Sequence, residues 1–107
     1  MKRRIRRHPE VSDDILDQAA YIARTSLPTA LRFMDAVEAT LRWLLRRPGA
    51  GSLREFEEPP LANVRSWQVK GFKNHLILYE IENGGIYVLS VIHGARDLPR
   101  LLRGRVR

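Results

Sequence analysis

His93 and Arg96 stand three positions apart in this chain. Histidine can carry out acid–base chemistry and arginine can bind phosphate. An imidazole can donate or accept a proton and a guanidinium can hold a phosphate, so the pair could cleave RNA without a metal ion. Arg65 and either Tyr79 or Tyr87 are candidates to supplement them. The set is sparse, and a histidine that ends an apolar strand more often forms a structural hydrogen bond. His93 and Arg96 are therefore weak catalytic candidates.

The spacing of the other reactive residue types disfavours metal and cofactor sites. His8, His75 and His93 are far apart in the sequence, and the chain has no cysteine; zinc sites need closely spaced ligands. The glycines form neither a P-loop nor a dinucleotide-binding motif, and no motif surrounds a serine nucleophile. We expect no metal, no cofactor and no small-molecule substrate.

Basic residues are concentrated at the two ends of the chain, which has a net charge of +7. Five of the first seven residues are lysine or arginine, and the last twelve contain Arg96, Arg100 and Arg103 among five arginines. If the fold brings the ends together, they form one patch that favours an acidic protein surface or nucleic acid. The alternative is that short basic tails only keep the protein soluble.

Two tryptophans stand near cations and are candidates for an interface. Trp67 lies between Arg65 and Lys70 in an alternating stretch, and Trp43 lies off the main apolar stripe of a predicted helix. Core packing is the default interpretation of Trp67. A partly exposed tryptophan beside cations would instead anchor a protein interface.

Length and composition predict one domain over residues 1–107. The chain is 44% apolar and 29% charged, which suits a single core. The apolar runs are too short to span a bilayer, and no apolar stretch follows the basic N-terminus as it would in a signal peptide. We expect a cytoplasmic protein with no membrane segment.

The apolar periodicity predicts an opening edge strand over residues 2–7 and then two helices. The first begins at Pro9 or after a capping Ser12, and the second begins after a capping Ser26 and ends at Pro48 and Gly49. Helices joined by so short a link pack as an antiparallel hairpin. The stripe of the second helix comprises Ala30, Phe33, Met34, Val37, Leu41, Leu44 and Leu45.

The second half of the chain predicts three antiparallel strands after a long surface loop over residues 48–63. The strands cover residues 64–70, 75–82 and 86–93, with a turn at Asn83, Gly84 and Gly85 between the last two. A helical turn near Leu98 would carry Arg100 and Arg103 outward. The expected fold is α+β with two layers, a helical hairpin on a small antiparallel sheet in the order β-α-α-β-β-β.

Several stretches in order along the chain form a pattern that is shared with a known family. They are Asp14-Ile15, Tyr21-Ile22-Ala23, Ala30 and Phe33, Leu44, Pro48 and Gly51, Arg65-Ser66-Trp67-Gln68-Val69, Gly71-Phe72, His75-Leu76-Ile77-Leu78-Tyr79 and Val88 through Asp97. The most specific part is the ending His-Gly-Ala-Arg-Asp after an apolar strand. With this pattern the chain resembles, over nearly its whole length, the ParE toxins of the RelE/ParE superfamily, which belong to type II toxin–antitoxin (plasmid stabilization) modules.

The resemblance implies a toxin that poisons DNA gyrase and is neutralised by a ParD-like antitoxin with a ribbon-helix-helix DNA-binding half. RelE-like relatives instead cut mRNA on the ribosome, using several basic residues and often a C-terminal tyrosine. Arg96 matches one of their arginines, but Leu76 stands where another would be, and Leu101 and Leu102 stand where the tyrosine would be. We therefore expect a non-catalytic gyrase inhibitor, with a ribosome-dependent mRNA endonuclease as the alternative.

This interpretation assigns candidate contacts to two partners in a hetero-oligomeric complex. The candidates for target binding are Arg96, Arg100, Arg103 and Trp67. The candidates for antitoxin binding are Trp43, Arg65 and Arg42.

Overall fold

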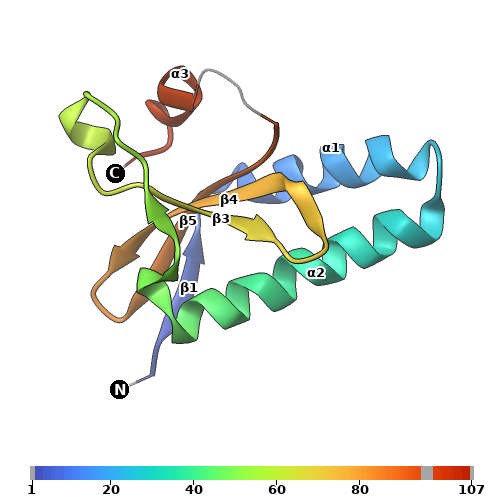
Figure 1. Cartoon of the computed structure of the whole chain (residues 1–107), viewed down its shortest axis with the longest axis horizontal. Coiled ribbons are helices and arrows are strands. Elements are labelled where there is room, and N and C mark those ends of the chain that lie inside the picture. Colours follow the sequence, from blue (N-terminus) through green and yellow to red (C-terminus); the bar gives the residue numbers. More distant parts are fainter. Residues whose placement is uncertain (1, 95–97, 107) are drawn as a thin grey trace.

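The computed structural model describes residues 2–94 and 98–106 of the chain, and Figure 1 shows its arrangement. A helical hairpin lies along one face of a twisted sheet, and a short C-terminal helix lies on the other side. The elements are β1 (Arg4–Arg7), α1 (Val11–Ala23), α2 (Leu27–Arg46), β2 (Ser52–Leu53), β3 (Arg65–Val69), β4 (Phe72–Glu82), β5 (Gly85–His93) and α3 (Leu98–Leu102), with 3-10 turns at Pro48–Ala50 and Pro59–Leu61.

The sheet has five strands in the order β1-β5-β4-β3-β2. The expected edge position of β1 is confirmed, but β1 runs parallel to β5, with Ile5 opposite Ile86, while the other pairs are antiparallel. The sheet is therefore mixed rather than purely antiparallel. The parallel pairing lets β1 lead directly into α1, which packs back across the neighbouring β5.

Local sequence explains where the two long helices begin and end. Ser26 caps α2 as expected, and its hydroxyl oxygen accepts a hydrogen bond from the Thr29 N–H at 3.2 Å. In contrast, α1 begins at Val11 with Glu10 as its N-cap, so neither Pro9 nor Ser12 has the expected role. The guanidinium of Arg3 donates to the terminal carbonyl groups of α2, which otherwise lack partners within the helix.

The apolar face of the helical hairpin packs on the sheet and forms the larger core. Phe33, Val37, Leu41 and Leu44 of α2 are fully buried there, as the stripe predicts. Tyr79 of β4 lies in the same core. Burial of these side chains is the main source of stability that the sequence pattern provides.

A second, smaller core covers the opposite face of the sheet and explains why β5 is apolar on both faces. Leu78 and Leu89 project into it, and the segment after β2 contributes Leu61 and Val64. Helix α3 closes it with Leu98 and Leu102. The helical hairpin therefore covers only one of the two apolar faces.

Two strand boundaries differ from the sequence-based expectation. The segment 48–63 was expected to be a loop throughout, but Ser52–Leu53 pairs with β3 as a short edge strand. Strand β4 begins at Phe72 rather than at residue 75, because Gly71, with φ of 81°, completes the turn within two residues. Within the described residues, no helix has the length and apolar character needed to cross a membrane.

Candidate functional site

The two tryptophans that the sequence singled out stack on each other at the surface. The Trp43 ring of α2 lies 5.1 Å from the Trp67 ring of β3, with 14° between their planes. The Arg47 guanidinium lies 4.8 Å from the centre of the Trp43 ring. Both tryptophans are half-buried and pack against the larger core. Core packing and partial exposure were alternatives for Trp67, and the structure shows both: the ring packs against the larger core and is also partly exposed.

The tryptophan pair forms one end of a groove between α2 and the β3–β4 hairpin, which we call the tryptophan groove. It has a volume of about 810 Å³ and is lined mainly by apolar atoms. Ala39 and Thr40 of α2 form one side, and Val69, Lys70 and Lys73 form the other. The described residues that line it include two lysines and no carboxylate.

One hydrogen-bonded side chain fixes the hairpin side of the tryptophan groove to α2. The buried Thr40 hydroxyl donates to the Ala36 carbonyl at 2.7 Å and accepts from the Lys70 N–H at 3.1 Å. This hydrogen bond holds the backbone at the start of the β3–β4 turn against α2, while the Lys70 side chain is exposed. The groove lies between elements that are distant in the sequence, so its shape could not be predicted from the sequence.

The candidate antitoxin contacts lie near this groove but differ in their availability. Arg42 is exposed on α2, next to Trp43 in the sequence. Arg65 instead donates to the carbonyl groups of Gly51 at 2.7 Å and Gly49 at 3.3 Å. Its guanidinium therefore fastens the segment after α2 to β3, which is a structural role.

The candidate target contacts do not share one surface. Trp67 packs with the helical hairpin, whereas α3 packs on the opposite face of the sheet. Arg100 and Arg103 are exposed on and just after α3, as expected. Arg103 donates to both carboxylate oxygens of Glu58, at 2.7 to 3.1 Å. Arg96 lies outside the described residues.

Many of the terminal cations bind groups of this chain, which changes the expectation of one basic patch built from both ends. The Arg6 guanidinium lies 2.9 Å from Glu82. Arg7 forms a two-pronged pair with Glu38, and this hydrogen bonding raises the pKa of Arg7 and lowers the pKa of Glu38. These two arginines therefore connect β1 to α2 and to the end of β4 beside the β4–β5 turn.

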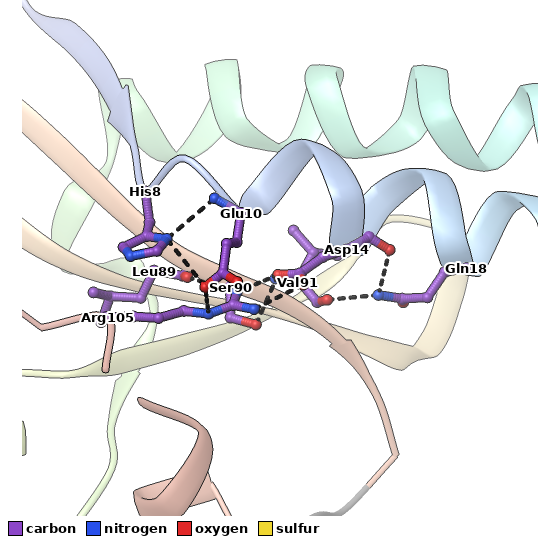
Figure 2. A network of polar contacts seen from close by, with 8 residues as sticks. All are labelled: His8, Glu10, Asp14, Gln18, Leu89, Ser90, Val91 and Arg105. Atoms are coloured by element: carbon purple, nitrogen blue, oxygen red, sulfur yellow. Dashed lines mark hydrogen bonds and ion pairs between the residues drawn. The ribbon is translucent and has the colours of Figure 1, made fainter. Parts of the chain in front are cut away.

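A buried arginine near the C-terminus lies at the centre of a polar network that connects three elements (Figure 2). Arg105 is only 9% exposed, and its guanidinium donates to both carboxylate oxygens of Asp14. It also donates to the Leu89 carbonyl at 3.1 Å. The hydrogen bonds with Asp14 raise the pKa of Arg105. The segment after α3 is thereby fixed to the first turn of α1.

The same carboxylate also binds β5. Asp14 accepts hydrogen bonds from the Ser90 hydroxyl at 3.0 Å and the Val91 N–H at 3.2 Å. A carboxylate in the first turn of a helix is commonly explained by the helix dipole alone. The partners of Asp14 lie more than seventy positions away, so no local signal identified this network.

The catalytic candidate His93 lies at the exposed end of β5, opposite His75 of β4. Their rings are 4.7 Å apart, and His75 also contacts the Phe33 ring at 4.7 Å. Burial, and secondarily the neighbouring His93, lowers the pKa of His75. Among the described residues, no group of three or more histidine, cysteine or acidic side chains could hold a metal ion.

The fold of this chain is shared with a solved structure. The fold is similar to that of a solved chain described as "Chromosomal ParDE TA system from P. aeruginosa", with a TM-score of 0.68 and 14% identity, covering 87% of this chain and 97% of that one. The comparison with curated proteins gives no match.

A family model identifies the particular family. The model described as "ParE toxin of type II toxin-antitoxin system, parDE" matches residues 5–98. The chain therefore belongs to the ParE toxin family of type II toxin–antitoxin systems.

Proposed function

We propose that this ParE-family toxin acts in the cytoplasm by binding and inhibiting DNA gyrase, without cutting RNA, and that a ParD-like antitoxin neutralises it. The family membership supports a toxin with an antitoxin partner. The choice of target and mode of action rests on the residues that replace those of the RNA-cleaving relatives.

The observation that carries the proposal is the environment of three leucines. Leu76, Leu101 and Leu102 stand where RelE-like enzymes tend to carry an arginine and a tyrosine. Here they belong to the smaller core: Leu102 is fully buried, and Leu76 and Leu101 pack against the same cluster. These positions stabilise α3 on the sheet and supply neither a cation nor a phenol for phosphate chemistry.

His93 has surroundings that favour a structural role. Its neighbour across the strand pair is His75, whose lowered pKa keeps that imidazole neutral near pH 7. A neutral imidazole packed against Phe33 provides no positive charge to stabilise a phosphorane. The pair is better suited to packing at the end of β4 and β5 that lies away from the hairpin turn.

Induced expression in cells distinguishes gyrase inhibition from RNA cleavage. We expect growth arrest with accumulated DNA double-strand breaks and intact transcripts, measured by gel analysis of genomic DNA and by primer extension on abundant mRNAs. Co-expression of the antitoxin is expected to restore growth. Codon-linked transcript cuts that disappear in His93→Ala would overturn the proposal and favour the mRNA endonuclease.

A further inference from the structure

The outer edge of the sheet is only partly covered beside the tryptophan groove. Strand β2 pairs only with Arg65 and Ser66 of β3, and its first residue, Ser52, lies opposite Ser66, so Trp67–Val69 continue past the start of β2. The Val64 carbonyl accepts from the Arg54 N–H at 2.8 Å, so alternate residues after Val64 direct their backbone groups toward this edge. Gln68 is the next of these beyond β2. An exposed strand edge of this kind is a template for another strand.

The open stretch has a defined far end. The Lys70 N–H points toward α2, where the Thr40 hydroxyl accepts its hydrogen bond. Beyond this point the chain enters the turn at Gly71 and returns as β4. An added strand would therefore occupy the edge of β3 between Ser66, where the pairing with β2 stops, and Lys70, and would lie along the tryptophan groove.

The chemistry of the groove indicates what such a strand would carry. Trp43 and Trp67 offer an apolar wall for one or two side chains of the incoming segment. Lys70 and Lys73 are exposed at the hairpin side and have no acidic neighbour in the lining. An extended segment with apolar side chains on one face and carboxylates beside them complements this surface.

The same surface is poorly suited to single-stranded nucleic acid, although it combines aromatic rings with cations. Nucleic-acid bases bind by stacking on free ring faces. One face of Trp43 is covered by Trp67, and the Arg47 guanidinium also stacks on the Trp43 ring. An open strand edge, in contrast, offers backbone donors and acceptors that a peptide matches.

We propose that the tryptophan groove and the β3 edge form the docking site for an acidic, extended segment of the antitoxin, which adds as a strand beside Trp67–Val69. This inference rests on the proposed antitoxin partner. It locates that partner at the sheet edge and adds Lys70 and Lys73 to the candidate antitoxin contacts Trp43, Arg65 and Arg42.

Hydrogen exchange of the full-length toxin, alone and co-purified with its antitoxin, tests the site directly. We expect the amide of Gln68, the one in this stretch that points to the open edge, to exchange at least about tenfold more slowly in the complex, because strand addition gives it a new hydrogen bond. Protection confined to other segments of a stable complex would overturn this inference alone. Failure of the two proteins to co-purify would contradict the proposed function as well.

Charge reversal in the groove provides an independent measurement. The variant K70E/K73E is expected to bind the antitoxin about tenfold or more weakly, with a smaller dependence on salt. The matched control K2E/R24E makes the same change in net charge at two exposed cations outside the groove lining and is expected to stay within about twofold of wild type. Equal losses in both variants would indicate attraction by net charge only and would overturn the assignment.

A third arm tests the nucleic-acid alternative with the free toxin. Oligo-dT of twenty nucleotides and a poly-U RNA of the same length serve as probes in the same exchange experiment. We expect no protection of the Gln68 amide by either probe. Protection by a probe, lost in K70E/K73E, would assign the groove to nucleic acid and overturn the proposal.

Discussion

The carboxylate of Asp14 binds the guanidinium of Arg105 across 91 positions of sequence, at the point where the chain enters its first helix. The pair connects α1 to the segment after α3 and is largely shielded from solvent, with side chains 16% and 9% exposed. Leaving one member of such a pair buried without the other is strongly destabilising. This contact therefore holds the C-terminal segment over the smaller core.

We expect Asp14→Ala to lower the free energy of unfolding by about 3 kcal/mol, because the buried Arg105 would lose its closest carboxylate and keep only the Leu89 carbonyl and the more distant Glu10. The neighbouring Asp13→Ala provides a control: it also removes a carboxylate from the first turn of α1, but at an exposed position, and should cost less than about 1 kcal/mol. Urea denaturation measures both values. Equal effects of the two substitutions would show that the ion pair contributes little.

The phenol of Tyr79 closes the segment that follows α2. It donates to the Pro48 carbonyl at 2.6 Å and accepts from the Gly51 N–H at 2.9 Å, and burial raises its pKa, so it remains a neutral donor. Tyr79→Phe should therefore cost about 1–3 kcal/mol of unfolding free energy, since two backbone groups lose their partner. Tyr21→Phe, at a 69% exposed position, should change the unfolding free energy very little. An unchanged denaturation midpoint for Tyr79→Phe would contradict this role.

Stability should fall as the solution is acidified from pH 7.5 to pH 5. Burial lowers the pKa of His75 in the folded state, while in the unfolded chain it titrates near 6.5. The unfolded state therefore binds the proton more strongly, and the stabilisation present above pH 6.5 is lost as pH falls toward the lower folded pKa.

Replacement of the imidazole isolates its contribution to this pH dependence. His75→Phe should flatten the stability profile between pH 5 and pH 7.5, measured by urea denaturation at each pH. The control His8→Asn replaces a histidine that lies outside the larger core and should retain the slope. A wild-type slope in His75→Phe would assign the pH dependence to other groups.

Arg100, an exposed arginine of α3, tests target binding. Arg103 is paired with Glu58, so its replacement would also disturb the smaller core's covering segment. We expect Arg100→Glu to reduce toxicity at least about tenfold in a dilution assay, because exposed charge mainly affects association, and the denaturation midpoint measured alongside checks that the domain remains folded. Arg24→Glu, on α1's C-terminal side, should remain toxic. Full growth arrest by Arg100→Glu would remove this residue from the target surface.

The fold was largely predictable because its information is local. The stripe from Ala30 to Leu45 defines α2, and Ser26 supplies its cap. The parallel placement of β1 was not predictable, because Ile5 pairs with Ile86, which is distant in the sequence. The smaller core was not predictable either, because Leu61 packs on the face of the sheet opposite the helical hairpin through contacts between distant segments. The tryptophans were recognisable as surface candidates by type, but their stacking depends on how α2 crosses β3.

Charge was the least reliable guide to the site. In the sequence, arginines such as Arg7, Arg65 and Arg105 are of the residue type that forms a binding patch for an acidic partner. In the structure, each of them binds a carboxylate or carbonyl group of this chain. Whether an arginine is free for a partner depends on acidic residues and carbonyl groups that the fold brings near it. In the sequence Lys70 was noted only as a cation near Trp67 and Lys73 was not noted, but the β3–β4 hairpin places both beside an apolar groove.

The most direct measurement of the proposed action uses purified toxin, purified gyrase and supercoiled plasmid, with a transcript added to the same reaction. The account predicts linear plasmid that accumulates with toxin concentration and needs gyrase, while the transcript remains full-length and His93→Ala behaves as wild type. Transcript cleavage without any trapped DNA break, abolished by His93→Ala, would contradict it.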